Sequence, residues 1–202
     1  MPLLKSLDQF DRSLFRLVQQ GSTAFLDGVM PYLRDPYIWI PVYAFMFYYA
    51  FRASRSRVGE PGPWFFILLS IVTVAITDSV AAQVMKPLFG RLRPCHDPEM
   101  QVLLRNLVSC GGLYSMPSNH ASNHFGLATF WYYSIRAING RKWRWLWLWA
   151  ALICYAQVYV GKHYPFDVLV GAVFGFLTGW GMSRLFIYWK SKLHHLPGGG
   201  TA

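Results

Sequence analysis

Two histidines, each beside groups that suit it for catalysis, are the residues best able to carry chemistry in this chain. His120 ends the run Pro-Ser-Asn-His, and His163 stands four residues before Asp167. An imidazole transfers protons near neutral pH. A neighbouring carboxylate fixes the imidazole tautomer and stabilises its cationic form, which makes the other ring nitrogen a competent nucleophile. Helix capping is the simpler alternative for Asp167.

A group of cations precedes the first histidine. Lys86, Arg91 and Arg93 follow directly on an apolar run. Arginine offers a planar fork of donors and lysine a compact charge, and both suit phosphate oxygens. The segment is therefore a candidate phosphate clamp. The alternative is a positive cap that anchors an apolar helix among lipid headgroups.

Ser118 and Asn119 stand where a helix is expected to begin, and both are favoured N-cap residues. The free N–H groups at a helix N-terminus bind anions, so these residues are candidate phosphate ligands as well as caps. His120 and His124 also have the i, i+4 spacing of zinc ligands, and His163 or Asp167 could complete such a site. We expect no metal, because the nearby cations would repel a divalent ion.

The composition excludes an ordinary soluble domain. Of 202 residues, 54% are hydrophobic and 14% are charged, whereas a soluble domain carries about 25% charged residues. The formal net charge of +10 suits an anionic membrane surface or a phosphorylated substrate. Nucleic acid is not an expected partner, because the basic residues lie between apolar runs and form no single stripe.

The length and the apolar runs predict one all-α domain over residues 1–202, built as a polytopic transmembrane bundle over residues 37–188. Five segments are long or apolar enough to be spans, and each is apolar on all sides. They are residues 37–51, 64–85, 120–135, 145–160 and 167–188.

Residues 7–33 differ from these spans. Apolar residues recur there at helical spacing but are interrupted by Asp8, Asp11, Arg12 and Arg16. We interpret the segment as an amphipathic helix in the membrane interface, with a sixth span as the alternative. The segment has no compact apolar core followed by a small-residue cleavage site, so we expect no signal peptide.

Basic residues predict the orientation of the bundle, because they are enriched in cytoplasmic loops. Three clusters fall on one side if the five spans alternate, and that side should be cytoplasmic, together with a tail at 189–202. The clusters are Arg52, Arg55 and Arg57; Arg136, Arg141, Lys142 and Arg144; and Lys190 and Lys192. The loop at 86–119 and the turn at 161–166 then share the outer face, and they carry nearly all the candidate chemistry.

The motifs together resemble the type 2 phosphatidic acid phosphatase family, whose catalytic core is similar to that of vanadium-dependent haloperoxidases. That family has a Lys, six residues and then Arg-Pro, which Lys86 to Pro94 matches. It has Pro-Ser-Gly-His, met at 117–120 with asparagine in place of glycine. Its third motif is Ser-Arg, five residues, His, three residues, Asp; His163 and Asp167 match, but Ala156 and Gln157 replace Ser-Arg. The similarity covers about residues 78–175.

The resemblance implies a metal-independent phosphatase that forms a phosphohistidine. His163 would attack phosphorus, Asp167 would orient His163, and His120 would protonate the leaving oxygen. The residues implied to bind the phosphoryl oxygens are Lys86, Arg93, Ser118 and Asn119. Gln157 would occupy the place of an arginine and supply neutral hydrogen bonds alone, so we expect Arg91 or Lys162 to provide the missing charge.

The implied substrate is a lipid mono- or diphosphate at the outer face of the cytoplasmic membrane. Undecaprenyl diphosphate is slightly favoured by the short chain, with phosphatidylglycerophosphate and lipid A phosphates as the other candidates. A lipid phosphotransferase with the same intermediate and a non-catalytic lipid-phosphate binding or transport protein are the alternatives. Asp78, inside the second span, is expected to hold helices together. Cys95 and Cys110 are disulfide candidates in an oxidising compartment, with free thiols as the alternative.

Overall fold

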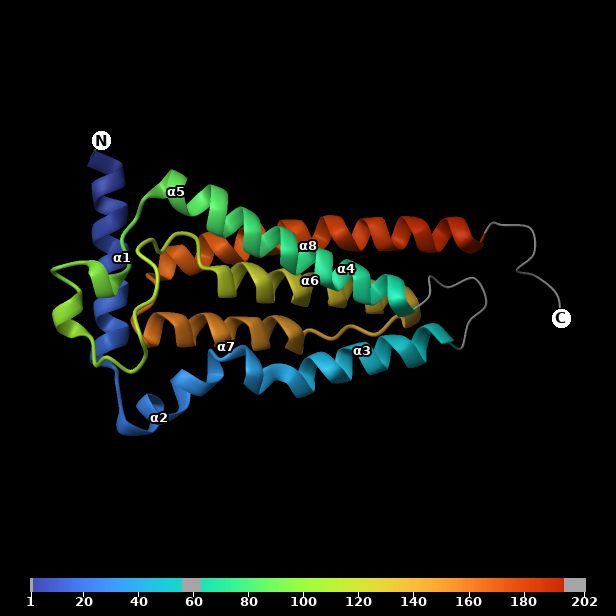
Figure 1. Cartoon of the computed structure of the whole chain (residues 1–202), viewed down its shortest axis with the longest axis horizontal. Coiled ribbons are helices and arrows are strands. Elements are labelled where there is room, and N and C mark those ends of the chain that lie inside the picture. Colours follow the sequence, from blue (N-terminus) through green and yellow to red (C-terminus); the bar gives the residue numbers. More distant parts are fainter. Residues whose placement is uncertain (1, 56–62, 195–202) are drawn as a thin grey trace.

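The computed structural model describes residues 2–55 and 63–194 of the chain, and this part is helical apart from loops and one isolated β-bridge between Leu92 and Tyr114. The all-α fold class is therefore confirmed. Four long helices, α3, α4, α6 and α8, and the shorter α7 run side by side (Figure 1). The α-helices are α1 (Pro2–Gln20), α2 (Ala24–Leu33), α3 (Ile40–Arg55), α4 (Pro63–Val80), α5 (Lys86–Phe89), α6 (Asn119–Asn139), α7 (Trp145–Tyr159) and α8 (Pro165–His194).

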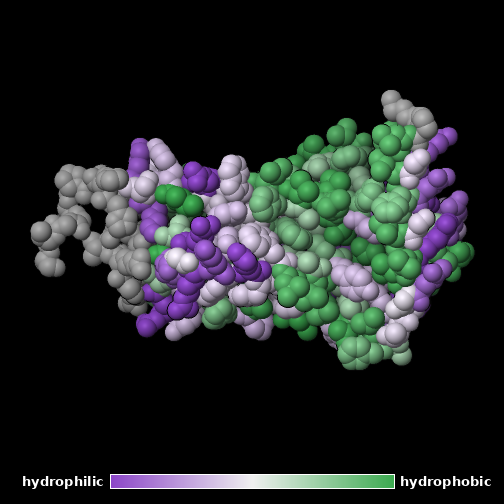
Figure 2. Space-filling view, turned by 180° about the vertical axis from the view of Figure 1, so that it is seen from behind, coloured by the Kyte–Doolittle hydropathy of each residue, from purple (hydrophilic) through white to green (hydrophobic). Residues whose placement is uncertain are grey.

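The bundle has the surface of a membrane protein. Figure 2 shows a hydrophobic band between two more hydrophilic ends. Two helical stretches, Pro63–Phe89 and Pro165–Lys192, are long and apolar enough to cross a membrane, and the apolar Trp145–Tyr159 is shorter. Each of the five expected spans coincides with a helix of the bundle. The first begins later than expected, because Pro36–Trp39 forms a 3₁₀ turn before α3.

The second expected span is not a uniform helix. A π-helical turn at Ala81–Met85 joins α4 to the short α5. Such turns insert a residue into a helix and often occur at functional sites. Here the turn sets the direction in which Lys86, the first residue of α5, leaves the membrane helix. Gly90 ends α5 at φ 59°, a backbone conformation that glycine adopts without steric cost.

The N-terminal segment is two helices, so the expectation of one amphipathic helix over residues 7–33 is wrong. The chain breaks at residues 21–23, where the side chain of Thr23 caps α2. Helix α1 lies across one end of the bundle and not alongside its helices (Figure 1), which fits the interfacial interpretation better than a sixth span. Phe15 of α1 is fully buried against Tyr164 and Val158.

Helices α6 and α8 form the closest pair in the bundle because glycines line their contact. A Cβ atom added at Gly175 would lie 2.2 Å from the Ser122 carbonyl oxygen, and one at Gly179 would lie 2.2 Å from that of Gly126. Small residues at every fourth position let two backbones approach in a membrane, where packing replaces the hydrophobic effect. This seam brings the N-termini of α6 and α8 together.

Aromatic side chains fill the core on the other side of α6. Trp131 is buried and stacks on Trp149 of α7, with ring centroids 6.0 Å apart, and Phe130 packs against Phe66 and Phe186. The ends of α3, α6 and α8 that carry the basic clusters lie together, at the opposite end of the bundle from α1 (Figure 1). Arg57 and residues 195–202 lie outside the described residues, as does the side chain of Arg55.

Candidate active site

The turn between α7 and α8 holds His163 beside Asp167. Both side chains are buried, and His163 Nδ1 lies 3.7 Å from Asp167 Oδ2. Burial lowers the pKa of His163 to about 4, although Asp167 opposes that shift. The imidazole is therefore neutral at neutral pH and keeps a free electron pair, as a nucleophile requires.

Asp167 is held by more than its histidine. Its Oδ2 accepts a hydrogen bond from the backbone N–H of Tyr164 at 2.8 Å, so it also caps α8. Its backbone oxygen accepts from the N–H of Ser118 at 2.9 Å, which ties the start of α6 to the first turn of α8. Capping and support of His163 are thus functions of one carboxylate.

Arg91 does not lie free to bind phosphate, contrary to the sequence expectation. Its Nη1 lies 2.6 Å from Asp11 and 3.0 Å from Asp167, and its Nη2 lies 3.0 Å from Asp8. The guanidinium also sits 4.0 Å above the ring of Tyr164. Arg91 therefore anchors Asp167 and cannot replace the charge that Gln157 lacks.

Asp8 and Asp11 are site residues that sequence reasoning missed. The buried Asp11 also accepts a hydrogen bond from the backbone N–H of Phe166 at 2.9 Å. Their sequence signal was the pair of acids that interrupts an amphipathic pattern, but nothing local links them to a residue 80 positions later. The contact exists because α1 folds across the start of α8.

The N-terminus of α6 is fixed to α4. Ser118 is buried, and its side chain accepts from the Ala121 N–H, so it caps the helix. The Asn119 amide donates to the Asp78 carboxylate at 2.9 Å, and that of Asn123 donates to it at 3.1 Å. Asp78 thus joins two helices, which is the structural role expected for it.

His120 follows on α6 and lies within electrostatic range of His163 and Lys162. His124 has both ring nitrogens engaged, by the His120 backbone oxygen at 2.7 Å and the Tyr43 hydroxyl at 3.1 Å. Within residues 2–55 and 63–194, the ligand atoms of the two helix histidines do not gather with those of His163 or Asp167. The alternative of a zinc site therefore finds no matching geometry.

Three cations from different segments, Lys86, Arg93 and Lys162, lie near His163, and Arg93 Nη1 donates a hydrogen bond to the Lys162 carbonyl oxygen at 3.5 Å. Lys86 and Arg93 both act electrostatically on His163, and each acts on Lys162. Burial lowers the pKa of Lys162 to about 8, with further lowering by neighbouring cations. Such clustering costs energy without a bound anion, so it indicates a site for a multiply charged one.

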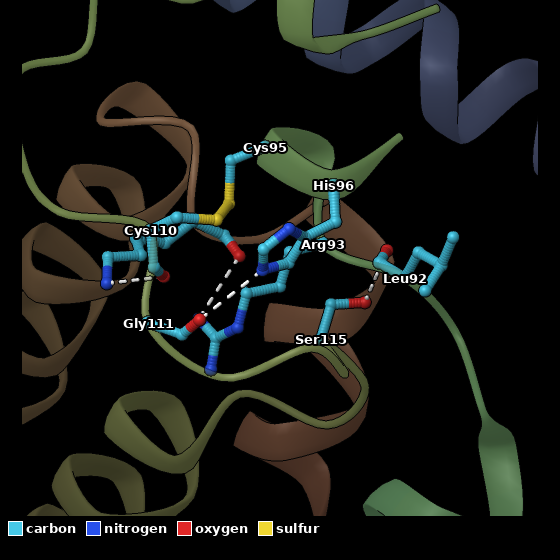
Figure 3. Close-up of a disulfide and its surroundings, with 8 residues drawn as sticks. Leu92, Arg93, Cys95, His96, Cys110, Gly111 and Ser115 are labelled. Carbon is cyan, nitrogen blue, oxygen red and sulfur yellow. Dashed lines mark hydrogen bonds between the residues drawn. A yellow bond between two sulfur atoms is a disulfide. The ribbon is translucent and has the colours of Figure 1, made fainter. Parts of the chain in front are cut away.

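A disulfide between Cys95 and Cys110 braces the loop that carries Arg93 (Figure 3). Their Cα atoms are 6.0 Å apart. The Cys110 carbonyl oxygen accepts a hydrogen bond from Lys162 Nζ at 2.7 Å. The loop that carries Arg93 is therefore tied to the turn that bears His163.

Gln157 lies near this turn on the last part of α7. It is buried, and its Nε2 has no hydrogen-bond partner among the residues that the structure describes. Its backbone oxygen accepts from the Lys162 N–H at 3.1 Å. The side chain thus offers a free donor but no charge.

Comparisons with known proteins agree with this arrangement. The model of the PAP2 superfamily matches residues 63–191. The lipid A 4'-phosphatase of Bacteroides thetaiotaomicron is 29% identical over 195 residues, 95% of this chain and 81% of that protein. The undecaprenyl-diphosphatase of Sulfolobus acidocaldarius is 30% identical over 170 residues, 82% and 73% of the two chains.

A second lipid A 4'-phosphatase, from Porphyromonas gingivalis, is 25% identical over 187 residues, 91% of this chain and 76% of that protein. Among solved structures, a transmembrane PAP2-type phosphatidylglycerolphosphate phosphatase from Bacillus subtilis has the same fold. The TM-score is 0.65 at 18% identity, over 93% of this chain and 87% of that one.

The helical bundle with its apolar helices, and the buried histidine–aspartate pair beside several cations, define the class of a membrane phosphatase. The chain belongs to the PAP2 superfamily, because the family model covers more than half of it. The resemblance seen in the motifs is thereby confirmed.

Proposed function

We propose that the protein hydrolyses a lipid phosphate or diphosphate through a phosphohistidine on His163. The observation that carries the proposal is the buried pair of His163 and Asp167, with Lys86, Arg93 and His120 within electrostatic range of the imidazole. A neutral imidazole backed by a carboxylate and facing a cluster of cations suits attack on an anionic phosphorus centre.

In the first step, the free Nε2 of His163 attacks phosphorus, and the bond from phosphorus to the lipid oxygen breaks. Asp167 Oδ2 stabilises the positive charge that develops on the ring. His120, as the imidazolium that the bound phosphate dianion stabilises, gives its proton to the leaving oxygen, which is a poor leaving group as an anion. Lys86, Arg93, Ser118 and the Asn119 backbone are the proposed donors to the equatorial phosphoryl oxygens.

In the second step, water attacks the phosphohistidine. Neutral His120 takes the water proton, the P–N bond breaks, and inorganic phosphate leaves with His163 restored. Each proton that His120 loses in the first step returns in the second. The residues needed for the cycle come from the chain itself.

A cleft beside the pocket suits the lipid part of the substrate. It has a volume of about 630 Å³ and lies between α3, α4 and α6. Asp78 and Asn123 line its polar part, and Phe47, Val74 and Leu127 are among its apolar lining residues. A headgroup in the pocket could therefore leave an acyl or prenyl chain in an apolar environment.

We propose lipid A phosphate as the first substrate to test, ahead of the undecaprenyl diphosphate favoured by chain length. Two relatives aligned over 95% and 91% of this chain are named lipid A 4'-phosphatases. We also propose that the pocket faces outward from the cytoplasmic membrane, because the basic clusters lie at the opposite end of the bundle. Labelling of Lys142→Cys by an impermeant thiol reagent in intact cells would show that the basic end faces outward and would contradict this orientation.

The test is phosphate release from lipid A, undecaprenyl diphosphate and phosphatidylglycerophosphate in detergent micelles. We expect release from at least one of them, with a loss of at least about 10³-fold in His163→Ala. Arg16→Ala is the matched control, because Arg16 is an exposed cation on α1 outside the pocket. Activity that survives His163→Ala would overturn the mechanism, and no release from any of the lipids would overturn the function.

A further inference from the structure

Gln157 lacks the charge of the arginine that the family has at this position. A cation from outside the three motifs could supply that charge. Arg34 is one such residue. It follows the last residue of α2, 123 positions before Gln157 in the chain, and stands in the C-cap position of that helix. No catalytic motif includes it.

The packing of α2 brings Arg34 to the pocket. Leu33 and Met30 belong to an apolar cluster with Ala156 and Tyr159, which flank Gln157 on α7. Figure 1 shows α2 beneath the end of α7 that leads into the turn bearing His163. The Leu33 carbonyl oxygen accepts a hydrogen bond from the Trp39 indole at 2.8 Å. The backbone just before Arg34 is therefore fixed both by the apolar cluster and by this hydrogen bond.

The Arg34 side chain is placed among the site cations. It is in electrostatic range of Arg93 on the outer loop, Lys162 in the α7–α8 turn and His120 on α6. Its Nε is buried and has no hydrogen-bond partner within residues 2–55 and 63–194. The neighbouring Asp35 also acts on the guanidinium, but its carboxylate caps the next turn by accepting a hydrogen bond from the Tyr37 N–H at 3.0 Å. A guanidinium that meets other cations and leaves a buried donor unused is therefore suited to an anion that bridges them.

We infer that Arg34 is a phosphoryl-binding residue that supplies, from the N-terminal segment, the guanidinium absent at Gln157. Gln157 on α7 is buried, and its Nε2 offers a neutral donor. The two together provide the hydrogen bonds and the charge of one arginine. This inference rests on the proposed function, since the anion is the phosphoryl group of the lipid substrate.

The test is a mutant cycle over Arg34 and Gln157 with the best lipid phosphate found for the wild-type enzyme. Loss of one preorganised donor to a transition-state oxygen costs about 10²–10³-fold in rate, so Arg34→Ala should lower kcat/KM by roughly 10²-fold. Arg34→Lys should recover part of it, because lysine keeps the charge but not the fork. Gln157→Arg should raise the rate by at least about tenfold more in Arg34→Ala than in the wild-type background, because the two positions supply the same charge.

Inhibition by inorganic phosphate separates binding from folding. Its inhibition constant should rise about tenfold or more in Arg34→Ala and return toward the wild-type value when Gln157→Arg is added. The exposed Arg16→Ala is the control of equal charge change. The inference would be overturned if Arg34→Ala kept the wild-type kcat/KM. It would also be overturned if the phosphate inhibition constant of Arg34→Ala were unchanged and Gln157→Arg did not raise its rate. No hydrolysis by the wild-type enzyme would end the proposed function itself.

Discussion

Arg91 and Arg93 stand two positions apart on the same loop, yet they have opposite environments. Arg91 faces three carboxylates and lies over the ring of Tyr164. Arg93 has one long hydrogen bond, from Nη1 to the Lys162 carbonyl oxygen at 3.5 Å, and its buried Nε has no partner in the described part of the chain.

The pKa values of the two guanidiniums shift in opposite directions. Burial alone would lower the pKa of Arg91, but Asp167, Asp11 and Asp8 more than offset it and the pKa rises. Burial lowers the pKa of Arg93, and Asp167 offsets that only in part. The difference shows how one loop serves two purposes. Arg91, whose hydrogen-bond donors are paired with carboxylates, stabilises the structure. Arg93, which has a buried donor without a partner, is suited to bind an anionic ligand.

The largest expected effect is on catalysis, in a variant of Arg93. Arg93→Ala should lower kcat/KM by about 10²–10³-fold, because a donor to the developing phosphoryl charge is lost. Its thermal stability in detergent should stay near that of the wild type, since few protein contacts are removed. A loss of stability with an unchanged rate would break the comparison.

Arg91→Ala should act mainly on stability. It leaves the buried Asp11 and Asp167 without their cation, and breaking a buried ion pair costs about 3–5 kcal/mol. The midpoint of thermal unfolding should fall well below that of Arg93→Ala. Adding Asp11→Asn should recover part of the loss, because one uncompensated carboxylate is removed. Wild-type stability in Arg91→Ala would contradict the assignment.

The smallest expected effect is a change in pH dependence through Lys162. Its pKa is lowered to about 8, chiefly by burial. Its charge is therefore present below pH 8 and lost above it, so kcat/KM should decline as the pH rises through that value. Lys162→Arg should move this decline upward by about one unit or more, because arginine stays charged. The acid side, governed by His163 with a pKa of about 4, should not move. If the decline of kcat/KM at alkaline pH were unchanged in Lys162→Arg, Lys162 would not be a phosphate-binding residue.

The sequence was sufficient for the parts of the fold and site that local patterns determine. Long apolar runs predict membrane helices because a lipid environment requires continuous backbone hydrogen bonding. The motif residues His120, His163 and Arg93 could be named because their types and spacings imply phosphate chemistry, and their roles in that chemistry stay predictions. The π-helical turn before Lys86 has no comparable signal, since it arises from packing of the helix end.

The remaining site contacts depend on tertiary structure. Asp11 lies on α1 and Arg34 directly follows α2, and these two helices occupy the stretch that the sequence presents as one amphipathic segment over residues 7–33. Their roles follow from where α1 and α2 dock, and no periodicity encodes that docking. Arg91 was assigned to phosphate for a related reason: the type and spacing of a cation do not reveal which anions already surround it.

The glycine seam between α6 and α8 has a mechanical consequence. With backbone pressed against backbone, the two helices cannot slide or roll past each other without a clash, so the halves of the pocket that bear His120 and His163 move as one body. Admission of a bulky lipid must then come from displacement elsewhere. Helix α3 meets its neighbours through aromatic side chains, which can rotate and re-pack, and it borders the cleft. We therefore expect the groups at the starts of α6 and α8 to stay aligned while α3 moves to admit the substrate.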